Sequence, residues 1–445
     1  MSQQNGSIKG AISRRGFLGA SAALAGGLAA SRFGTALAAG YEPQMAGAAA
    51  EGALAGLQAT GALDEAYWRR VAAQFNVVDE MIYMNNGTLG PMPRTVFDTN
   101  VYYLRAIAED PRETFRDKVE EVRGKLAAFV GADADEVVLT RSTTEGEKIF
   151  CAGLDLAQGD EILMSSHEHG GGAGPWRARV ERHGITIKEV EIPAPPESVD
   201  QIVSLCEAAI TPRTRVLLVS HPIYVTGTLM PIQPLAEMAH RHGLLISVDG
   251  AHALGMMNLD LHGYGIDHYT TAGQKWLMAG TGTGLSYFRR DVQSRVWADM
   301  PFDEGAGAAR YERSGQRNVP SILGMGAAVD FQNAIGKQNV ESRIHYLAGY
   351  LRDGLAEIPN VSIGTSTSPE LSGGLTVFYI ADVPNTTTAR VIMERQGIHI
   401  VRSGLNPSAC RVSTHIYTQP AQIDHLLEGI RHIAENAANY RETSA

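Results

Sequence analysis

An acid and an amine near the middle of the chain each follow a run of residues that predicts a buried strand. Asp249 closes the apolar run from Leu244 to Val248, and His252 comes three residues later. Lys275 follows a second predicted strand, around Tyr269 to Ala272. Open α/β sheets bind ligands in the crevice at the carboxyl ends of their strands. We therefore expect Asp249 and Lys275 to face the same crevice.

This pair of residues suits one cofactor in particular. Pyridoxal phosphate needs a lysine to form its Schiff base and an acidic partner for its pyridine nitrogen. Lys275 would supply the first and Asp249 the second. Taken alone, Asp249 is more simply a helix cap and Lys275 a solvated loop charge. Together, and with the Gly/Thr-rich sequence around Lys275, they favour the cofactor.

A candidate phosphate site lies where another predicted strand gives way to a helix, in the sequence Arg141-Ser142-Thr143-Thr144-Glu145. Hydroxyl groups and free backbone N–H groups at a helix N-terminus bind anions. We therefore interpret Thr143 and Thr144 as ligands of the cofactor's phosphate. An ordinary N-cap with a nearby glutamate explains the same residues equally well.

Two further loops follow predicted strands. Ser166-His167-Glu168-His169 precedes three glycines. Two histidines this close could bind a metal, but no further ligands cluster nearby in the sequence. We therefore expect His169 to lie flat on the pyridine ring, with a surface loop as the alternative. In the second loop, Tyr224 either donates to the cofactor's phenolic oxygen or packs in the core, and both interpretations stay open.

Arg411 lies within an apolar predicted strand, after Ala409 and Cys410. An unpaired charge is costly in such a place. A substrate carboxylate would give the guanidinium a bidentate partner. An internal ion pair is the alternative.

The elements around these motifs predict the fold class. Strands and helices alternate from Val137 to Asp249, which predicts an α/β protein with a mainly parallel, doubly wound sheet. A smaller C-terminal α/β unit is expected from about Val340. We divide the chain into an N-terminal arm (61–110), a large cofactor-binding domain (111–339) and a small C-terminal domain (340–445).

The first 60 residues predict export. Ser13-Arg14-Arg15-Gly16-Phe17-Leu18, an Ala/Gly-rich stretch and Ala36-Leu37-Ala38 are typical of a twin-arginine signal peptide over residues 1–38. Residues 39–60 are expected to form a flexible leader. The apolar stretch falls short of the ~20 residues that a membrane span needs, so no stable anchor is expected. The twin-arginine translocase is therefore the expected partner during export, and the periplasm the expected location.

Charge and cysteine content exclude two classes of protein. The formal net charge is −10, and no basic stripe is available to neutralise phosphates, so nucleic acid is not an expected partner. A disulfide framework is not expected, because the cysteines are few and their number is odd: Cys151, Cys206 and Cys410.

From about Met81 to Ala434, these motifs together resemble the class V aminotransferase family of fold-type I pyridoxal-phosphate enzymes. The most specific signal is Thr271-Ala272-Gly273-Gln274-Lys275 before Gly282-Thr283-Gly284, combined with Asp249-x-x-His252. The resemblance implies the fold of PLP-dependent transferases of fold type I and a homodimer with active sites at its interface.

The resemblance also implies roles for single residues. His252 would lie near the phenolic oxygen, and Gln274 would belong to the cofactor contacts. The loop from Gly315 to Pro320 would be lent to the neighbouring subunit's phosphate site through Gln316. Cysteine desulfurases of this class carry a nucleophilic cysteine in the loop that matches Arg402 to Asn406. No cysteine lies there, so desulfurase activity is not expected.

Within the family, the chain is similar to the isopenicillin N epimerase-like branch and to exported enzymes that tailor the glutamate side chain of the siderophore pyoverdine. This implies a small amino-acid or peptide-like substrate. We expect removal of its α-proton, with Lys275 as the proton shuttle, in transamination or epimerisation. A non-catalytic binding protein on the same fold is the alternative from another class, and the Asp249/Lys275 pair argues against it.

Overall fold

The computed structural model describes residues 61–300, 304–313 and 315–441. All of them belong to one compact unit, residues 43–445. The predicted signal peptide and leader, residues 1–60, lie outside the described residues. Among the helices of the described part, none has both the length and the apolar character that crossing a bilayer requires.

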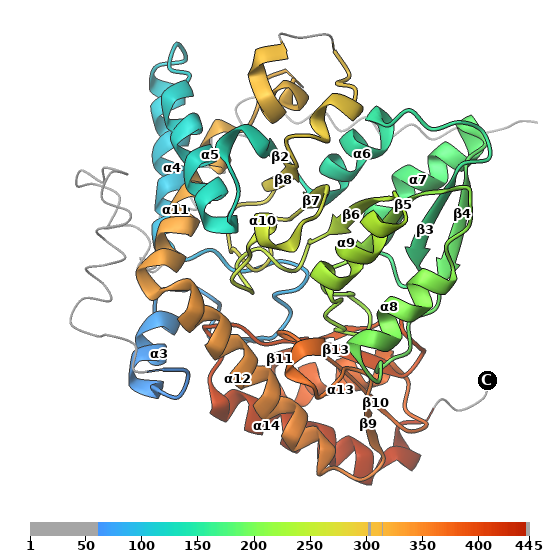
Figure 1. The fold of residues 1–445 in the computed structure, drawn as a ribbon. Coiled ribbons are helices and arrows are strands. Elements are labelled where there is room, and N and C mark those ends of the chain that lie inside the picture. The colour runs from blue at the N-terminus through green and yellow to red at the C-terminus, as the bar shows by residue number, and fades with distance from the viewer. Residues whose placement is uncertain (1–60, 301–303, 314, 442–445) are drawn as a thin grey trace, which may run out of the picture. The chain divides into compact units, whose positions relative to one another are not determined.

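A seven-stranded sheet forms the centre of the fold (Figure 1). Its order is β2-β8-β7-β6-β5-β3-β4, and every pair is parallel except the two that β8 makes. The strands are β2 (Val137–Thr140), β3 (Glu161–Ser165), β4 (Thr186–Val190), β5 (Thr214–Ser220), β6 (Leu245–Asp249), β7 (His268–Thr270) and β8 (Gly284–Phe288). The predicted α/β class with a mainly parallel sheet is confirmed.

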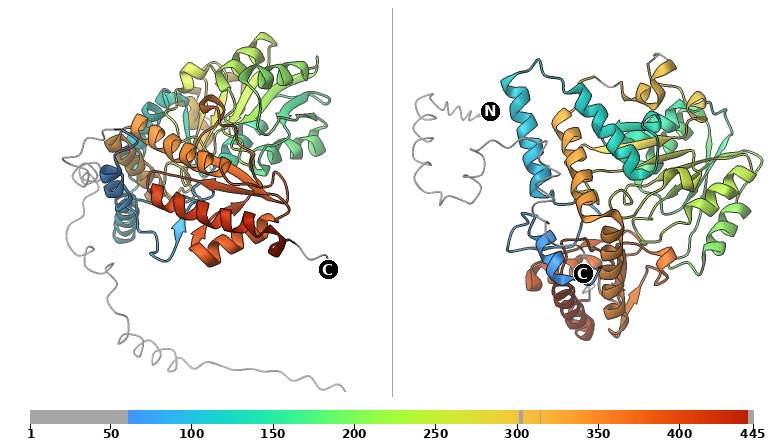
Figure 2. Two further views of the ribbon diagram at one scale, coloured as in Figure 1. Left: turned by 90° about the horizontal axis from the view of Figure 1, so that it is seen from below. Right: turned by 60° about the vertical axis from the view of Figure 1, so that its left-hand side comes forward.

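Helices connect and cover these strands. They are α3 (Glu65–Ala72), α4 (Arg94–Glu109), α5 (Arg116–Val130), α6 (Thr143–Gly153), α7 (Gly170–His183), α8 (Val199–Ala208), α9 (Ile232–Arg241), α10 (Leu261–Tyr264), α11 (Val319–Ile335), α12 (Lys337–Ala356), α13 (Asn385–Gln396) and α14 (Pro420–Glu435). The long helices α4 and α11 lie side by side, which fixes the N-terminal arm against the rest of the fold (Figure 2).

The sheet is covered on both faces, as alternate residues of β5 show. Leu217 and Val219 enter a core that includes residues of α5, α8, α9 and α11. Val216 and Leu218 enter a second core with residues of α6 and α7. This burial on both sides explains why the strand is an almost unbroken apolar run.

A smaller antiparallel sheet has the order β12-β13-β10-β9 and packs its own core against α12, α13 and α14. Its strands are β9 (Val361–Ile363), β10 (Leu375–Ile380), β12 (Val401–Arg402) and β13 (Ala409–Ser413). The apolar sequence from Ile398 to Val401 predicts one strand, and this prediction is wrong because the structure has two short strands there. Its first part, β11 (Ile398–His399), instead pairs in parallel with β1 (Ile82–Tyr83) of the arm. The domain boundaries at 110/111 and 339/340 stay predictions.

Two other differences from prediction have local causes. The sequence predicts a helix from Trp176 to His183, because the glycines before it are poor helix formers. Helix α7 instead begins at Gly170, where His169 caps its first turn. Strand β7 ends at Thr270 rather than near Ala272. Lys275 therefore lies in the loop between β7 and β8.

Helix α6 approaches the sheet most closely at Gly146. A Cβ atom there would lie 1.8 Å from Ser286 Oγ and 2.2 Å from Thr270 Oγ1. The Thr270 hydroxyl also donates to the carbonyl oxygen of Thr143, 3.2 Å away. The missing side chain thus lets the first turn of α6 sit directly on the strands.

We predict that Gly146→Ala destabilises the protein, because the added methyl group has no room. Overpacking of this kind costs about 1–3 kcal/mol, and the midpoint of thermal unfolding should fall. The matched control is Gly124→Ala in α5, where a Cβ would meet nothing within 4 Å. That change should be neutral or stabilising, since alanine is the better helix former. Equal midpoints for the two variants would contradict the close approach.

Candidate active site

The Lys275 amine lies beside a buried imidazole. Its Nζ atom is 3.2 Å from His252 Nε2. Burial lowers the pKa of Lys275 to about 8, while the nearby charge of Asp249 raises it and that of Arg411 lowers it. Near neutral pH, more of this amine is therefore unprotonated and nucleophilic than in an exposed lysine, although the protonated form still predominates.

Asp249 ends β6 at the carboxyl edge of the sheet, next to Ser220 of β5 and Thr270 of β7. Its Oδ1 atom accepts a hydrogen bond from the Ala251 N–H at 3.0 Å. A Cβ on Gly172 would lie 2.6 Å from the other carboxylate oxygen, so the start of α7 passes close to the acid. Burial raises the pKa of Asp249, and the positive charge of Lys275 opposes that shift. A further cation beside the carboxylate, such as a protonated ring nitrogen, would favour its charged form.

The N-termini of α6 and α7 converge at the predicted phosphate site. A Cβ on Gly171, in the first turn of α7, would lie 2.5 Å from Thr144 Oγ1. Thr143 Oγ1 is buried and has no hydrogen-bond partner among the described residues. Two helix N-termini with a free buried hydroxyl form a site for an anion.

His169 and Tyr224 meet above the strand ends. Their rings are edge to face, with centroids 4.9 Å apart. His169 caps α7 by accepting the Gly171 N–H at Nδ1, 3.0 Å away, and this bond fixes the orientation of the imidazole. The structure thus brings both predicted residues to the site.

Arg411 lies in β13 and is 6% exposed. Its guanidinium donates to the Tyr224 carbonyl at 3.3 Å, to Thr88 Oγ1 at 3.1 Å and to Asn85 Oδ1 at 3.4 Å. All three acceptors are neutral, and Nε has no partner within the described part of the chain. Burial lowers the pKa of Arg411 to about 10. Among the described residues, Arg411 is therefore held by neutral acceptors and not by the internal ion pair that was the alternative prediction.

The arm supplies residues that sequence reasoning missed. Besides Asn85 and Thr88, Asn86 donates from Nδ2 to the carbonyl oxygen of Lys275 at 3.2 Å. A Cβ on Gly90 would lie 2.2 Å from the same oxygen, so the two loops are in direct contact. The only signal in the sequence was the turn-rich run after a short apolar strand.

The two predicted glutamine contacts differ in position. Gln274 precedes the lysine, and its Oε1 is buried without a partner in the described regions. Gln316 is exposed, and its neighbour Arg317 pairs with Glu312 at 2.6 Å and donates to the Leu139 carbonyl. Within one chain, Gln316 is not among the residues hydrogen-bonded around Lys275.

Two buried glutamates beneath the site were also missed. Glu168 accepts from Ser165 Oγ at 2.6 Å, Ser220 Oγ at 2.6 Å and the Ser220 N–H at 3.0 Å, which ties the loop before His169 to the end of β5. Glu147 accepts from the Trp176 indole at 2.7 Å. Burial raises the pKa of each glutamate to about 8.

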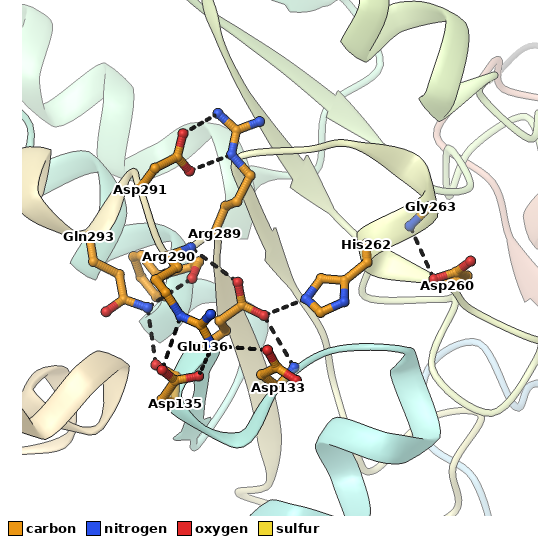
Figure 3. Close-up of polar contacts among 11 residues, drawn as sticks. Asp133, Asp135, Glu136, Asp260, His262, Gly263, Arg289, Arg290, Asp291 and Gln293 are labelled. Atoms are coloured by element: carbon orange, nitrogen blue, oxygen red, sulfur yellow. Dashed lines mark hydrogen bonds and ion pairs between the residues drawn. The ribbon is translucent and has the colours of Figure 1, made fainter.

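A cluster of possible metal ligands lies elsewhere, at the start of β2 (Figure 3). His262 Nε2 lies 2.5 Å from Glu136 Oε2. The Arg290 guanidinium bonds to Asp133 Oδ2 at 2.9 Å and to Asp135 Oδ1 at 2.8 Å. Arg290 thus pairs with Asp133 and Asp135, and its backbone N–H donates to Glu136 Oε1 at 3.1 Å, which links the segment after β8 to the turn before β2.

The residues around Lys275 fit pyridoxal phosphate. They comprise a buried amine, a buried carboxylate at a strand end and polar atoms on Thr143 and Gln274 for which the described residues offer no partner. A cofactor with an aldehyde, a basic ring nitrogen and a phosphate matches these groups in kind.

Comparison with known proteins agrees with this fit. The family model described as "Aminotransferase class-V" matches residues 82–426. The isopenicillin N epimerase of Amycolatopsis lactamdurans is 30% identical over 397 residues, which cover 83% of this chain and 99% of that protein. A probable cysteine desulfurase of Halalkalibacterium halodurans is 27% identical and covers 80% of this chain and 93% of its own length.

Solved structures share the fold. A mutant of C-DES with glycine covalently linked to the PLP cofactor superposes with a TM-score of 0.75 at 22% identity, covering 81% of this chain and 98% of its own. The cysteine desulfurase CsdA from Escherichia coli gives a TM-score of 0.71 at 24% identity, over 83% of this chain and 98% of its own. The chain therefore belongs to the class V aminotransferase family and is a pyridoxal-phosphate-dependent enzyme.

Proposed function

We propose that the enzyme removes and returns the α-proton of an amino-acid-containing substrate, in epimerisation, with transamination as the alternative outcome. The observation that carries this proposal is Arg411, a buried cation with only neutral acceptors in the described structure, close enough to Lys275 to lower its pKa. A carboxylate on the substrate's α-carbon would pair with Arg411 and hold the α-carbon near the amine.

The chain's residues divide the work as follows. When bound, pyridoxal phosphate supplies a ring that accepts electrons from the α-carbon. Lys275 would hold the cofactor through its amine, and the same amine would accept and return the α-proton of the substrate. Asp249 would hold the ring nitrogen, and His169 would pack on the ring. Thr143, Thr144 and Gln274 would bind the phosphate, while Tyr224 and His252 would lie beside the reacting end.

Desulfuration needs a nucleophilic thiol, and the buried cysteines support a different reaction. Cys151, Cys206 and Cys410 are all buried, and burial raises the pKa of each thiol, to about 12 for the last two. The loop from Arg402 to Asn406 has no cysteine. It is tied down by a hydrogen bond from Ser403 Oγ to the Val225 carbonyl at 2.7 Å.

Three further features extend the proposal. The twin-arginine sequence supports export to the periplasm through the twin-arginine translocase.

The exposed apolar residues Phe97 and Leu104 are seven apart, on one face of α4, and support a homodimer in which Gln316 reaches the partner's phosphate site. A substrate with an amino-acid end on a larger body, including a siderophore side chain, would suit the relatives' chemistry.

Borohydride reduction of the holoenzyme should fix the cofactor on the peptide that contains Lys275. Lys275→Ala should lose this mass and the visible absorption, and turnover should fall by about 10²–10⁴-fold because the proton acceptor is gone. The exposed Lys148 offers a matched control, since Lys148→Ala removes a lysine from the surface of α6. A cofactor fixed on any other lysine would refute the assignment.

Arg411→Met should weaken substrates that carry an α-carboxylate. A hydrogen bond to a charged group is worth about 1.5–3 kcal/mol, so kcat/KM should fall about 10–150-fold, whereas the amine that lacks the carboxylate should react as before. The control is Arg402→Met, which removes an exposed arginine from the neighbouring strand. An equal loss for both substrates would contradict the role of Arg411.

Turnover in deuterated water distinguishes the two reactions, with a panel of amino acids and amino-acid-ended peptides as substrates. In epimerisation the recovered substrate gains deuterium at the α-carbon, keeps its nitrogen and changes its optical purity. In transamination a keto acid accumulates. Mass spectrometry and chiral chromatography measure both, and no exchange with any substrate would end the proposal of α-proton removal.

A further inference from the structure

His252 uses both of its ring nitrogens. Nε2 lies 3.2 Å from Lys275 Nζ, and Nδ1 lies 3.2 Å from the indole nitrogen of Trp276. Both His252 and Trp276 are buried, so water does not replace these partners. The two neighbours, one residue apart in the chain, therefore hold the imidazole from both sides.

The two contacts are not equivalent, because an indole N–H can only donate. The contact with Trp276 makes Nδ1 the acceptor. A neutral imidazole carries one proton, so this proton must then be on Nε2, the nitrogen that faces the lysine. Nε2 is consequently a donor, and the nitrogen of Lys275 accepts from it only when that nitrogen is unprotonated.

The surroundings keep His252 neutral. Burial lowers the pKa of His252 well below its ordinary value, and the positive charges of Lys275, Arg411 and His169 lower it further. Asp249, at the end of β6, is the nearby acid, and its charge raises the pKa of Lys275. A second proton on the ring would have no acceptor at Nδ1, which Trp276 already occupies.

We infer that Trp276 is a positioning residue that locks His252 in its Nε2–H form, so that His252 donates to the lysine-bound reaction centre and does not act as a base. The inference rests on the proposed role of Lys275. It deepens that role, because it leaves the amine of Lys275, rather than the adjacent imidazole, to move the α-proton.

The backbone around Trp276 is held independently of its indole nitrogen. The Trp276 carbonyl accepts from Gln332 Nε2 and from His415 Nε2, each at 3.0 Å. The indole ring stacks on the His415 ring with centroids 5.3 Å apart. Replacing the indole by a phenyl ring thus removes the N–H donor and keeps the backbone contacts.

The test is a pH titration of the visible absorption of the holoenzyme, which follows the protonation of the nitrogen that joins Lys275 to the cofactor. A donor at His252 Nε2 opposes protonation there. In Trp276→Phe, Nε2 can become an acceptor, so the transition should move upward by about one pH unit, the size of one net hydrogen bond. An unchanged transition would overturn the inference.

Two controls separate this effect from loss of packing. Trp68→Phe removes another fully buried indole, which donates to the Gly61 carbonyl at 3.1 Å, and should leave the transition in place. His252→Gln keeps an N–H donor but has no tautomers. In that background Trp276→Phe should cause no further shift, and a full shift there would overturn the inference.

A second measurement holds even if Trp276→Phe binds cofactor poorly. The ¹⁵N spectrum of histidine-labelled wild-type holoenzyme, assigned by comparison with His252→Gln, should show the proton of His252 on Nε2, and a proton on Nδ1 would overturn the inference. Borohydride reduction of the same sample tests the proposed function separately. A cofactor on another lysine would refute the role of Lys275 and this inference with it, whereas attachment at Lys275 with an unmoved transition would refute the inference alone.

Discussion

Keeping a lysine amine out of water, between a carboxylate and a guanidinium, is the constraint on which the site depends. Lys275 feels opposing charges from Asp249 and Arg411, and burial sets the balance at a pKa of about 8. The three residues come from a loop, from the large sheet and from the small sheet. Each charge is costly in its own place, so both sheets must be in position to hold the three residues together.

Two buried glutamates beneath the site affect the charge of Asp249. Glu147 and Glu168 lie close enough to Asp249 that its charge raises the pKa of each, yet both are buried. Hydroxyl, indole and backbone donors surround them. Their raised pKa values favour the neutral form near pH 7, which spares Asp249 the repulsion of two further negative charges. Glu168 thus connects β3 with β5, and Glu147 connects α6 with α7 and β6. In the neutral form, neither acid competes with Asp249 for the charge of Lys275.

Local patterns predicted much of this structure. Apolar runs that end in polar residues marked β2, β5 and β6, and they placed Asp249 at the sheet edge. The glycines before Trp176 concealed the start of α7, because helix propensity is lowest there. Contacts between distant segments could not be predicted from local sequence patterns. Arg411 and Asn85 are 326 residues apart, and the sequence around each residue gives no indication that the two are in contact. Gln316 is exposed in the single chain, so its predicted contact with a partner subunit stays a prediction.

The pairing of the arm with the C-terminal region determines when the site can exist during synthesis. Asn85 bridges to Ser413, and β1 pairs with β11, so this part of the arm can form these contacts only after the C-terminal strands have been synthesised. A ribosome has made nearly all of the protein before Arg411 can meet its partners. The surroundings of Arg411 are therefore complete only when the C-terminal strands have been made, and a product truncated before β13 would carry Lys275 without Arg411.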